Sequence, residues 1–306
     1  MKTALVTGAN GFLGRHVAKL LASEGHQVIG MGHGTWTRDQ WKCWGLSDWH
    51  SCDINLQTLR TYGGAPDEIF HCAGSGSVAY SITHPLEDFN RTVETCISVL
   101  EFARLTSTVK RTVIPSSAGV YGATTITPTP VNTPLAPASP YGYHKVMAEH
   151  AAKSYAQFLG VRVSIVRLFS VYGPELRKQL LWDACTKLTR GDAKFSGTGD
   201  ETRDWIHVTD AASLMLAASK VCNENFVIFN GGSGNPVSVA TVVNELSSAL
   251  NTNAATTIDF DGAKRPGDPE RYHADIAESL ALGWRPIMEW RTGVREYAEW
   301  FKEDAK

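Results

Sequence analysis

The chain has 306 residues, of which 43% are hydrophobic and 20% are charged, with 29 basic and 31 acidic residues and a net charge of -2. This composition is typical of a folded globular protein and excludes disorder, collagen-like repeats and a coiled coil as the main architecture. The length predicts one large domain or two intimate ones, and the near-balance of charge gives no electrostatic reason to expect a nucleic acid or a membrane surface as a partner.

The sequence shows no pattern typical of membrane, secreted or metal-binding proteins. No apolar run is long enough to span a bilayer, and glycine interrupts the first apolar run so early that we expect no signal peptide. The six cysteines form no CxxC pair, so we expect reduced thiols and a cytoplasmic location, with neither disulfides nor zinc. No histidine–carboxylate spacing predicts another metal site.

Short β-rich runs alternate with longer helical segments through the first half of the chain. Strands separated by helices imply βαβ units and a doubly wound parallel sheet that is covered on both faces. We predict strands at Thr3–Gly8, Gln27–Met31, Asp67–Gly74, Arg111–Ser116 and Val161–Phe169, and helices at Gly11–Ser23, Leu86–Arg104 and Tyr141–Leu159.

After residue 170 the alternation becomes less regular. Helices are predicted at Leu176–Thr189, Val237–Leu250 and Trp290–Lys302, with a late strand at Phe226–Phe229. The sequence therefore predicts an α/β fold with a nucleotide-binding domain in residues 1–169 and a smaller substrate-binding subdomain in residues 170–306. Some segments of the second part, around residues 205–232, are expected to return to the main sheet.

A GxxGxxG pattern connects the first predicted strand to the first predicted helix. Gly8 permits a tight turn off the strand, Gly11 lets backbone amides approach a pyrophosphate, and Gly14 lets the helix pack closely on the strand. The N-terminus of that helix adds partial positive charge for the phosphates. Because the pattern follows a strand and opens a helix, it predicts a dinucleotide-binding site.

The spacing of these glycines differs from the GxGxxG of ordinary two-domain dehydrogenases. Thr7–Gly14 resembles the cofactor loop of the extended short-chain dehydrogenases/reductases, the family of nucleotide-sugar epimerases and dehydratases. The resemblance implies a Rossmann-type fold and an NAD(P) cofactor that also contacts Asn10, Phe12 and Leu13. It covers most of the chain, from Lys2 to Phe301.

The end of the second predicted strand bears on the choice between NAD and NADP. A carboxylate there would bind the ribose hydroxyls and select NAD, but no acidic residue occurs in this loop before Asp39. His33 and Arg38 could instead bind a 2′-phosphate, so we favour NADP; as plain surface residues they would leave NAD as the cofactor. Asp53 and Ile54 resemble the adenine-contacting pair of the family.

Tyr141 and Lys145 are four residues apart at the start of a predicted helix, so their side chains share one face. An ammonium beside a phenol stabilises the phenolate, which lets the tyrosine exchange a proton with a substrate oxygen. Residues 115–122 and 139–145 resemble the family's SSxxVYG and SPYGxxK motifs. The resemblance implies that Ser117 hydrogen-bonds the reacting oxygen, Tyr141 transfers the proton and Lys145 orients the nicotinamide ribose.

The two residues after Ser117 disfavour one branch of the family. Sugar-nucleotide 4,6-dehydratases carry an Asp–Glu pair where this chain has Ala118 and Gly119. Without those carboxyl groups the acid–base steps of dehydration have no obvious donor or acceptor. Ketone reduction, alcohol oxidation and epimerisation remain.

The segment after the third predicted strand resembles the stretch that lies beside the nicotinamide and the sugar in this family. The small side chain of Ala73 would let the ring approach. Ser75 and Ser77 would contact sugar hydroxyls, and Asn90 would secure the backbone near the active site or serve as an exposed helix cap.

Three later segments resemble substrate-binding motifs. Ser170 replaces the asparagine of R-x-x-N-V-Y-G-P that contacts the sugar nucleotide, which leaves that contact open. Arg203 and Arg265 match two arginines that bind the substrate diphosphate, in keeping with bidentate recognition of phosphate by guanidinium groups. Asp268 would contact a ribose.

The resemblance of these motifs implies an enzyme that acts on a nucleotide-diphospho-sugar and is similar to the NAD-dependent epimerase/dehydratase family. Our first hypothesis is an NADP-preferring reductase of a 4-keto sugar. The alternative is a 4-epimerase with tightly bound NAD that uses the same residues. A non-catalytic cofactor-binding scaffold need not retain Ser117, Tyr141 and Lys145 together. The helices near 86–104 and 141–159 resemble those that pair across a two-fold axis in the family, so we also expect a homodimer.

Overall fold

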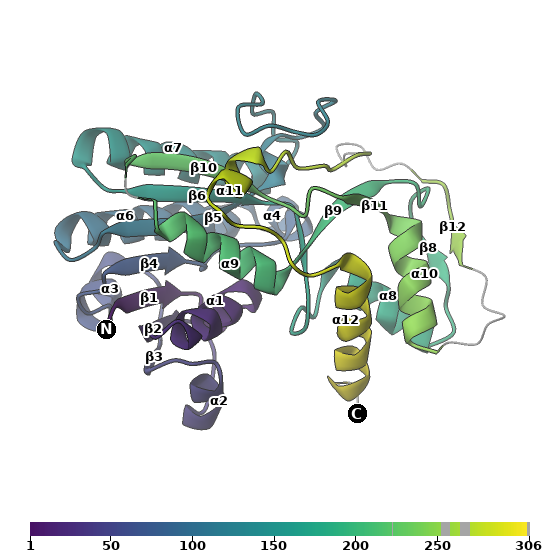
Figure 1. The fold of residues 1–306 in the computed structure, drawn as a ribbon, viewed down its shortest axis with the longest axis horizontal. Helices are drawn as coiled ribbons and strands as arrows, with labels where there is room; N and C mark the ends of the chain where they lie inside the picture. The colour runs from purple at the N-terminus through teal and green to yellow at the C-terminus, as the bar shows by residue number, and fades with distance from the viewer. Residues whose placement is uncertain (222, 252–257, 264–269, 305–306) are drawn as a thin grey trace.

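The structure is a computed structural model that describes residues 1–221, 223–251, 258–263 and 270–304. A larger lobe is built on a seven-stranded parallel sheet, and a smaller lobe lies beside it (Figure 1). The strand order β3-β2-β1-β4-β5-β6-β10 is that of the Rossmann fold with a seventh strand added at one edge, which confirms the predicted fold class. The strands are β1 (Thr3–Thr7), β2 (Gln27–Gly32), β3 (Asp48–Ser51), β4 (Glu68–His71), β5 (Arg111–Ser117), β6 (Val163–Leu168) and β10 (Phe226–Gly231).

Helices cover both faces of this sheet. In β1, Ala4 and Val6 join the core beneath α1 (Phe12–Ser23) and α9 (Val208–Ser219), whereas Leu5 joins the core on the opposite face. This burial on both sides explains why the strands are continuously apolar rather than alternating. The opposite face is covered by α3 (Leu56–Tyr62), α6 (Thr95–Leu105) and α7 (Pro140–Leu159).

Two parts of the larger lobe differ from the sequence prediction. No strand was predicted at β3, because its sequence Asp-Trp-His-Ser has no apolar run; it forms at the sheet edge through pairing with β2. The predicted helix Leu86–Arg104 is divided into α5 (Pro85–Phe89), a π-helical turn at Asn90–Glu94, and α6. Two further short helices, α2 (Arg38–Cys43) and α4 (Val78–Thr83), lie in the loops after β2 and β4.

The smaller lobe has its own core, formed mainly by three helices and two small sheets (Figure 1). Of the segments around 205–232 that were expected to return to the main sheet, β10 lies in it, whereas β9 belongs to a separate sheet because it pairs with β7 and β11. The elements of this lobe are β7 (Ser170–Tyr172), α8 (Gln179–Thr189), β8 (Lys194–Phe195), β9 (Thr202–His207), β11 (Pro236–Ser238), α10 (Val239–Ala249), β12 (Asp259–Phe260) and α12 (Trp290–Asp304). The short helix α11 (Ala277–Ala281) instead packs on the main sheet, where Ser279 donates a hydrogen bond to the carbonyl of Asn230 in β10.

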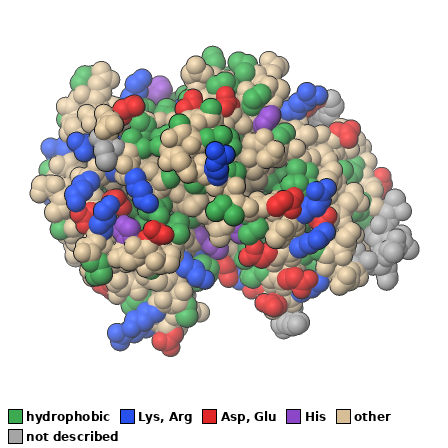
Figure 2. All heavy atoms as spheres, in the orientation of Figure 1, with side chains coloured by type: hydrophobic (Ala, Val, Ile, Leu, Met, Phe, Trp, Pro, Cys, Tyr) green, Lys and Arg blue, Asp and Glu red, His purple; other side chains and the backbone are tan. Residues whose placement is uncertain are grey.

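Charged side chains are intermixed on the surface. Figure 2 shows Lys and Arg among Asp and Glu over both lobes on the face in view, in keeping with the net charge of -2. Such a mixture is not typical of a surface that binds a polyanion. Among the described helices, none is both long enough and apolar enough to cross a membrane.

Candidate active site

The turn at the carboxyl end of β1 is shaped by two glycines of the GxxGxxG pattern. Gly8 has φ +68°, and a Cβ there would lie 2.5 Å from the backbone nitrogen of Ala73. A Cβ on Gly14 would lie 2.2 Å from the carbonyl oxygen of Gly8. The first helix therefore reaches this close approach to the turn only because both positions lack a side chain.

The N-terminus of α1 follows this turn without a capping side chain. Its N-cap is Gly11, no side chain accepts a hydrogen bond from the first amides, and no acidic residue lies in the first turn. Such amides form a ready site for phosphate oxygens. Two other predicted cofactor residues have packing roles, since Phe12 lies against the core of the smaller lobe and Leu13 against the core of the sheet.

The predicted adenosine-side residues come from β2 and from the loop after β3. His33 Nε2 lies 2.5 Å from Asp53 Oδ1, and both side chains are largely exposed. The carboxylate therefore lies beside the histidine that was expected to meet a 2′-phosphate. Ile54 packs against the core of the larger lobe, and Arg38 is exposed in the first turn of α2.

Ser117, Tyr141 and Lys145 meet where β5 ends and α7 begins. A Cβ on Gly119 would lie 3.4 Å from Ser117 Oγ and 3.6 Å from Tyr141 Cε1. Lys145 Nζ lies 5.8 Å from the centroid of the Tyr141 ring and donates a hydrogen bond to the carbonyl of Pro115 at 3.2 Å. The structure thus brings Ser117 and Tyr141 together at Gly119, with Lys145 beside the Tyr141 ring, and neither residue 118 nor residue 119 supplies an acid there.

Three polar residues that the sequence analysis did not single out hold the first turns of α7. The hydroxyl of Ser81, which is fully buried, accepts a hydrogen bond from the Tyr141 amide at 3.0 Å. Asp88, also fully buried, lies 2.5 Å from His144 Nδ1. These contacts tie α4 and α5 to the helix that carries Tyr141 and Lys145. No local pattern pairs residues this far apart, so the sequence carried no signal for them.

A second buried network lies one helical turn beyond Lys145. Glu149, one turn after Lys145, accepts hydrogen bonds from Ser116 Oγ at 2.6 Å and from Arg167 Nη2 at 2.6 Å. Arg167 also donates to the hydroxyl of Tyr121 at 3.0 Å. Arg167 is the arginine of the segment that resembles R-x-x-N-V-Y-G-P. It is 3% exposed, so it joins β6 to α7 and is not accessible to a ligand.

Burial keeps the groups next to Lys145 neutral. Burial, together with the charge of Lys145, lowers the pKa of His71 to about 3. Burial also raises the pKa of the Cys72 thiol to about 12. Near neutral pH the side chains of His71 and Cys72, which lie next to Lys145, are therefore uncharged. Within the described residues, no group of three or more His, Cys, Asp or Glu side chains is arranged to hold a metal.

Two of the predicted substrate residues line a large cavity in the smaller lobe. This cavity has a volume of about 1120 Å³ and includes Ser170, Arg203 and Phe195. The guanidinium of Arg203 lies over the ring of Tyr272, 5.4 Å from its centroid. Two further predicted substrate residues, Arg265 and Asp268, lie outside the described residues.

The loop Gly74–Ser77 runs past Lys145, the lysine predicted to be catalytic. A Cβ on Gly74 would lie 4.0 Å from Lys145 Nζ, and Ser75 follows it, half-buried. Ser77 caps α4 by accepting a hydrogen bond from the Tyr80 amide at 3.2 Å. The backbone after α5 is wound more widely, because the carbonyl of Asn90 accepts from the Thr95 amide in the π-helical turn. Such turns occur frequently at functional sites.

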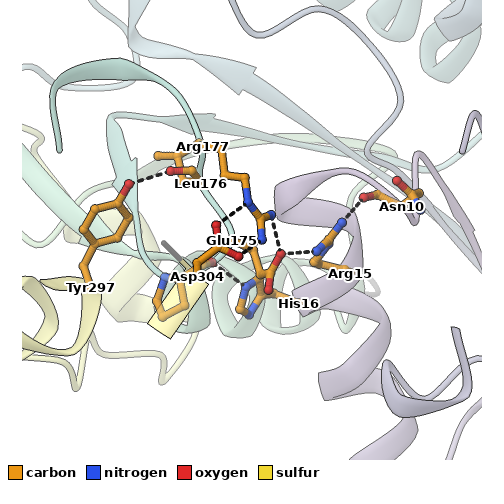
Figure 3. A network of polar contacts seen from close by, with 9 residues as sticks. Asn10, Arg15, His16, Glu175, Leu176, Arg177, Tyr297 and Asp304 are labelled. Carbon is orange, nitrogen blue, oxygen red and sulfur yellow. Dashed lines mark hydrogen bonds and ion pairs between the residues drawn. The ribbon is translucent and has the colours of Figure 1, made fainter. Parts of the chain in front are cut away.

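A charged network joins the glycine turn to the smaller lobe (Figure 3). Arg15 donates hydrogen bonds to the carbonyl of Asn10 at 2.6 Å and to Glu175 at 2.5 Å. Glu175 also accepts from Arg177, which in turn binds Asp304 in α12 at 2.6 Å. The segment between β7 and α8 is therefore anchored on both lobes.

Comparison with known proteins relates this geometry to one family. The sequence model of the NAD dependent epimerase/dehydratase family matches residues 4–231. A putative UDP-glucose 4-epimerase of Methanocaldococcus jannaschii is 27% identical over 98% of each chain, and a UDP-glucuronate 4-epimerase of Thermodesulfobacterium geofontis is 27% identical over 98% of this chain and 96% of its own. MoeE5, solved in complex with UDP-glucose and NAD, is similar in structure with a TM-score of 0.86 at 25% identity, covering 100% of both chains. These similarities favour the epimerase alternative over the reductase that the sequence analysis put first.

Proposed function

The chain belongs to the NAD-dependent epimerase/dehydratase family, and we propose that it is a nucleotide-sugar 4-epimerase that uses NAD. The observation that carries this proposal is the close placement of Ser117 and Tyr141 at Gly119, with Lys145 beside the Tyr141 ring. The names of the similar proteins support it, since they are epimerases of UDP-sugars.

The residues of the glycine turn and of the pair His33 and Asp53 fit NAD better than NADP. Gly8 and Gly14 let the turn pack closely against its neighbours, and the uncapped amides at the start of α1 suit a pyrophosphate. Asp53 places a carboxylate 2.5 Å from His33, so a 2′-phosphate near that histidine would meet a negative charge. This argument reverses the NADP preference inferred from the sequence. The chemistry that bound NAD supplies is reversible hydride transfer at a substrate carbon.

The three catalytic residues would manage the proton and the oxygen of the reacting carbinol. Tyr141 would take the proton of the C4 hydroxyl and later return it, while Ser117 would hydrogen-bond the same oxygen. Lys145 would stabilise the phenolate by its charge, next to His71 and Cys72, which are uncharged near neutral pH. Between the two proton transfers the 4-keto sugar must turn its other face to the same residues.

We place the nucleotide in the cavity of the smaller lobe and the sugar toward the loop Gly74–Ser77. The cavity of about 1120 Å³ has room for a nucleoside diphosphate, and Arg203 on its wall supplies a guanidinium for phosphate. The loop lies next to Lys145, so a sugar that contacts it is near Tyr141. The substrate class that fits both parts is a nucleotide-diphospho-sugar, with a UDP-sugar as the first choice.

The test is interconversion of C4 epimers without net redox change. Protein supplied with NAD and either UDP-glucose or UDP-glucuronate is expected to form the C4 epimer, measured by nuclear magnetic resonance. Tyr141→Phe removes the proton carrier and is expected to lower kcat by about 10²–10⁴-fold. The matched control is Tyr143→Phe on the same helix, an exposed residue whose replacement should leave kcat unchanged. Consumption of NADPH with a 4-keto sugar, and no epimerisation, would establish a reductase instead.

We also propose that two copies associate through the outer faces of α6 and α7. Large apolar side chains are exposed there, namely Ile97 on α6 and Tyr143, Met147 and Phe158 on α7. The three residues of α7 are spaced at four and eleven positions, so they lie along one stripe of the helix. A second copy would remove this stripe from water, which is the usual origin of a homodimer interface.

A further inference from the structure

Lys178 reaches from the smaller lobe to the loop beside the catalytic residues. It immediately precedes α8, and a Cβ built on Gly76 would lie 3.3 Å from its Nζ. On the same loop, a Cβ on Gly74 would lie 4.0 Å from Lys145 Nζ. Two ammonium groups from different lobes therefore flank the short loop Gly74–Ser77, where we place the sugar.

The charge of Lys178 is not neutralised by the protein. Among the described residues, none forms an ion pair with it or accepts a hydrogen bond from it, whereas the preceding residue, Arg177, is bound to Glu175 and Asp304. Partial burial of the ammonium lowers the pKa of Lys178. An ammonium in this condition gains from an anion that enters the cleft.

The segment that carries Lys178 is held in a defined conformation. Two non-glycine residues on either side of it have left-handed backbones, Glu175 with φ 77° and Gln179 with φ 67°. Such conformations persist only where surrounding contacts enforce them. Here the contacts are those of Figure 3, in which Glu175 binds Arg15 of α1 and Arg177 binds Asp304 of α12. The position of Lys178 over Gly76 is therefore set by both lobes.

The location of Lys178 distinguishes between the two kinds of anion that a nucleotide sugar can carry. The diphosphate is attached at C1, on the far side of the ring from C4, and Arg203 is available for it in the cavity of the smaller lobe. A C6 carboxylate lies next to C4, through C5. Lys178 is not among the residues that line the cavity, but it lies over the loop beside Lys145.

We propose that Lys178 binds the C6 carboxylate of a uronic acid, so that the preferred substrate is a nucleotide-diphospho-uronate. This inference rests on the proposed epimerase function and names its substrate class. Similarity to a UDP-glucuronate 4-epimerase agrees with it but does not distinguish it from a UDP-glucose enzyme, since both relatives are equally similar.

The experiment compares Lys178→Met with the wild type on UDP-glucuronate and UDP-glucose, in the presence of NAD. Loss of the ammonium is expected to raise KM for UDP-glucuronate by about tenfold to a hundredfold, the usual effect of losing a hydrogen bond to a charged group. KM for UDP-glucose should stay the same. Lys178→Arg should retain most of the preference. Lys194→Met, an exposed lysine of the same lobe, is the control and should change neither value.

Two results would overturn the inference: an equal loss on both substrates, which would place Lys178 at the shared diphosphate, or no loss on either. Binding of UDP-glucuronate and UDP-glucose, measured by titration calorimetry without turnover, gives a second readout. If the wild type epimerises neither sugar, the proposed function fails. The carboxylate contact would then still be supported by weaker binding of UDP-glucuronate alone to Lys178→Met, and refuted by unchanged binding.

Discussion

Tyr141 owes its position to residues far earlier in the chain. The first amides of a helix have no partner within it, and the buried hydroxyl of Ser81 accepts a hydrogen bond from the Tyr141 amide. Three positions later, His144 is bound to the buried carboxyl of Asp88. Ser81 and Asp88 are themselves fully buried, so these contacts hold the predicted catalytic tyrosine more firmly than exposed contacts would.

Three histidines, His71 and His207 in the interior and the half-buried His16, make the stability of the protein sensitive to acid. Burial lowers the pKa of His16 to about 4, of His71 to about 3 and of His207 to about 4, with the charge of Lys145 adding to the shift of His71 and that of His16 to the shift of His207. In the unfolded chain a histidine takes up its proton near pH 6.5, so between there and the folded values the unfolded state binds more protons. Stability is therefore present above about pH 6.5 and is lost as the pH falls toward 4.

The free energy of unfolding is expected to fall by about 2 kcal/mol for each of these histidines between about pH 7.5 and pH 5. Urea unfolding at these two values measures the difference. His16→Gln should make the fall smaller by the share of one histidine, whatever its effect at neutral pH. Equal unfolding free energies at both pH values would contradict the assignment of buried, neutral histidines.

At the scale of elements, the glycine turn shows how local spacing becomes tertiary packing. The GxxGxxG pattern was readable because a strand, a turn and a helix follow one another in the chain. The structure adds that Gly14 meets the carbonyl of Gly8, and that Gly8 meets Ala73 after β4. By contrast, neither β3 nor the π-helical turn at Asn90–Glu94 was predicted from the sequence. The first depends on pairing at a sheet edge, and the second on one additional residue within a helix that otherwise keeps its periodicity.

Gly14→Ala tests this packing. Its Cβ would lie 2.2 Å from a backbone oxygen, so α1 must move away from the turn, at a cost of about 1–3 kcal/mol in stability. We expect a lower urea midpoint and a weaker affinity for NAD, measured by fluorescence titration. Lys19→Ala, at an exposed position of the same helix, should leave both nearly unchanged. Normal NAD affinity in Gly14→Ala would mean that the close contact does not shape the cofactor site.

At the scale of the whole molecule, the two lobes are joined by charges and the two proposed subunits by apolar surface. Arg15, Glu175, Arg177 and Asp304 connect the cofactor turn to the last helix of the chain (Figure 3). The exposed stripe on α6 and α7 lies away from this network, on the helices that cover one face of the main sheet.

Ile97→Arg is expected to convert the proposed dimer into a monomer, because it places a charge in the apolar interface. Light scattering at micromolar concentration measures the mass. Ile287→Arg is the matched control, since Ile287 is 88% exposed and lies outside the stripe. A monomeric wild type, or an Ile97→Arg variant with the mass of the wild type, would exclude this interface.

The sequence by itself determined the family, the Rossmann-type fold and the candidate residues Ser117, Tyr141 and Lys145. These features are encoded by residues close together in the chain, where glycine spacing and helical periodicity act directly. The sequence alone put a reductase before an epimerase, an order that the similar proteins reverse. It favoured NADP because no acid follows the second strand, and the contact between Asp53 and His33, on which we base the proposal of NAD, exists only in the fold.

The tertiary structure decided which side chains share a neighbourhood. It placed Ser81 under Tyr141, Asp88 against His144 and Lys178 over the loop at Gly76. The two residues of each pair lie in segments that are far apart in the sequence. The periodicity within either segment therefore does not predict the contact. Packing of the lobes alone sets the burial and the distances on which charge and hydrogen bonding depend, and these in turn set the chemistry of the site.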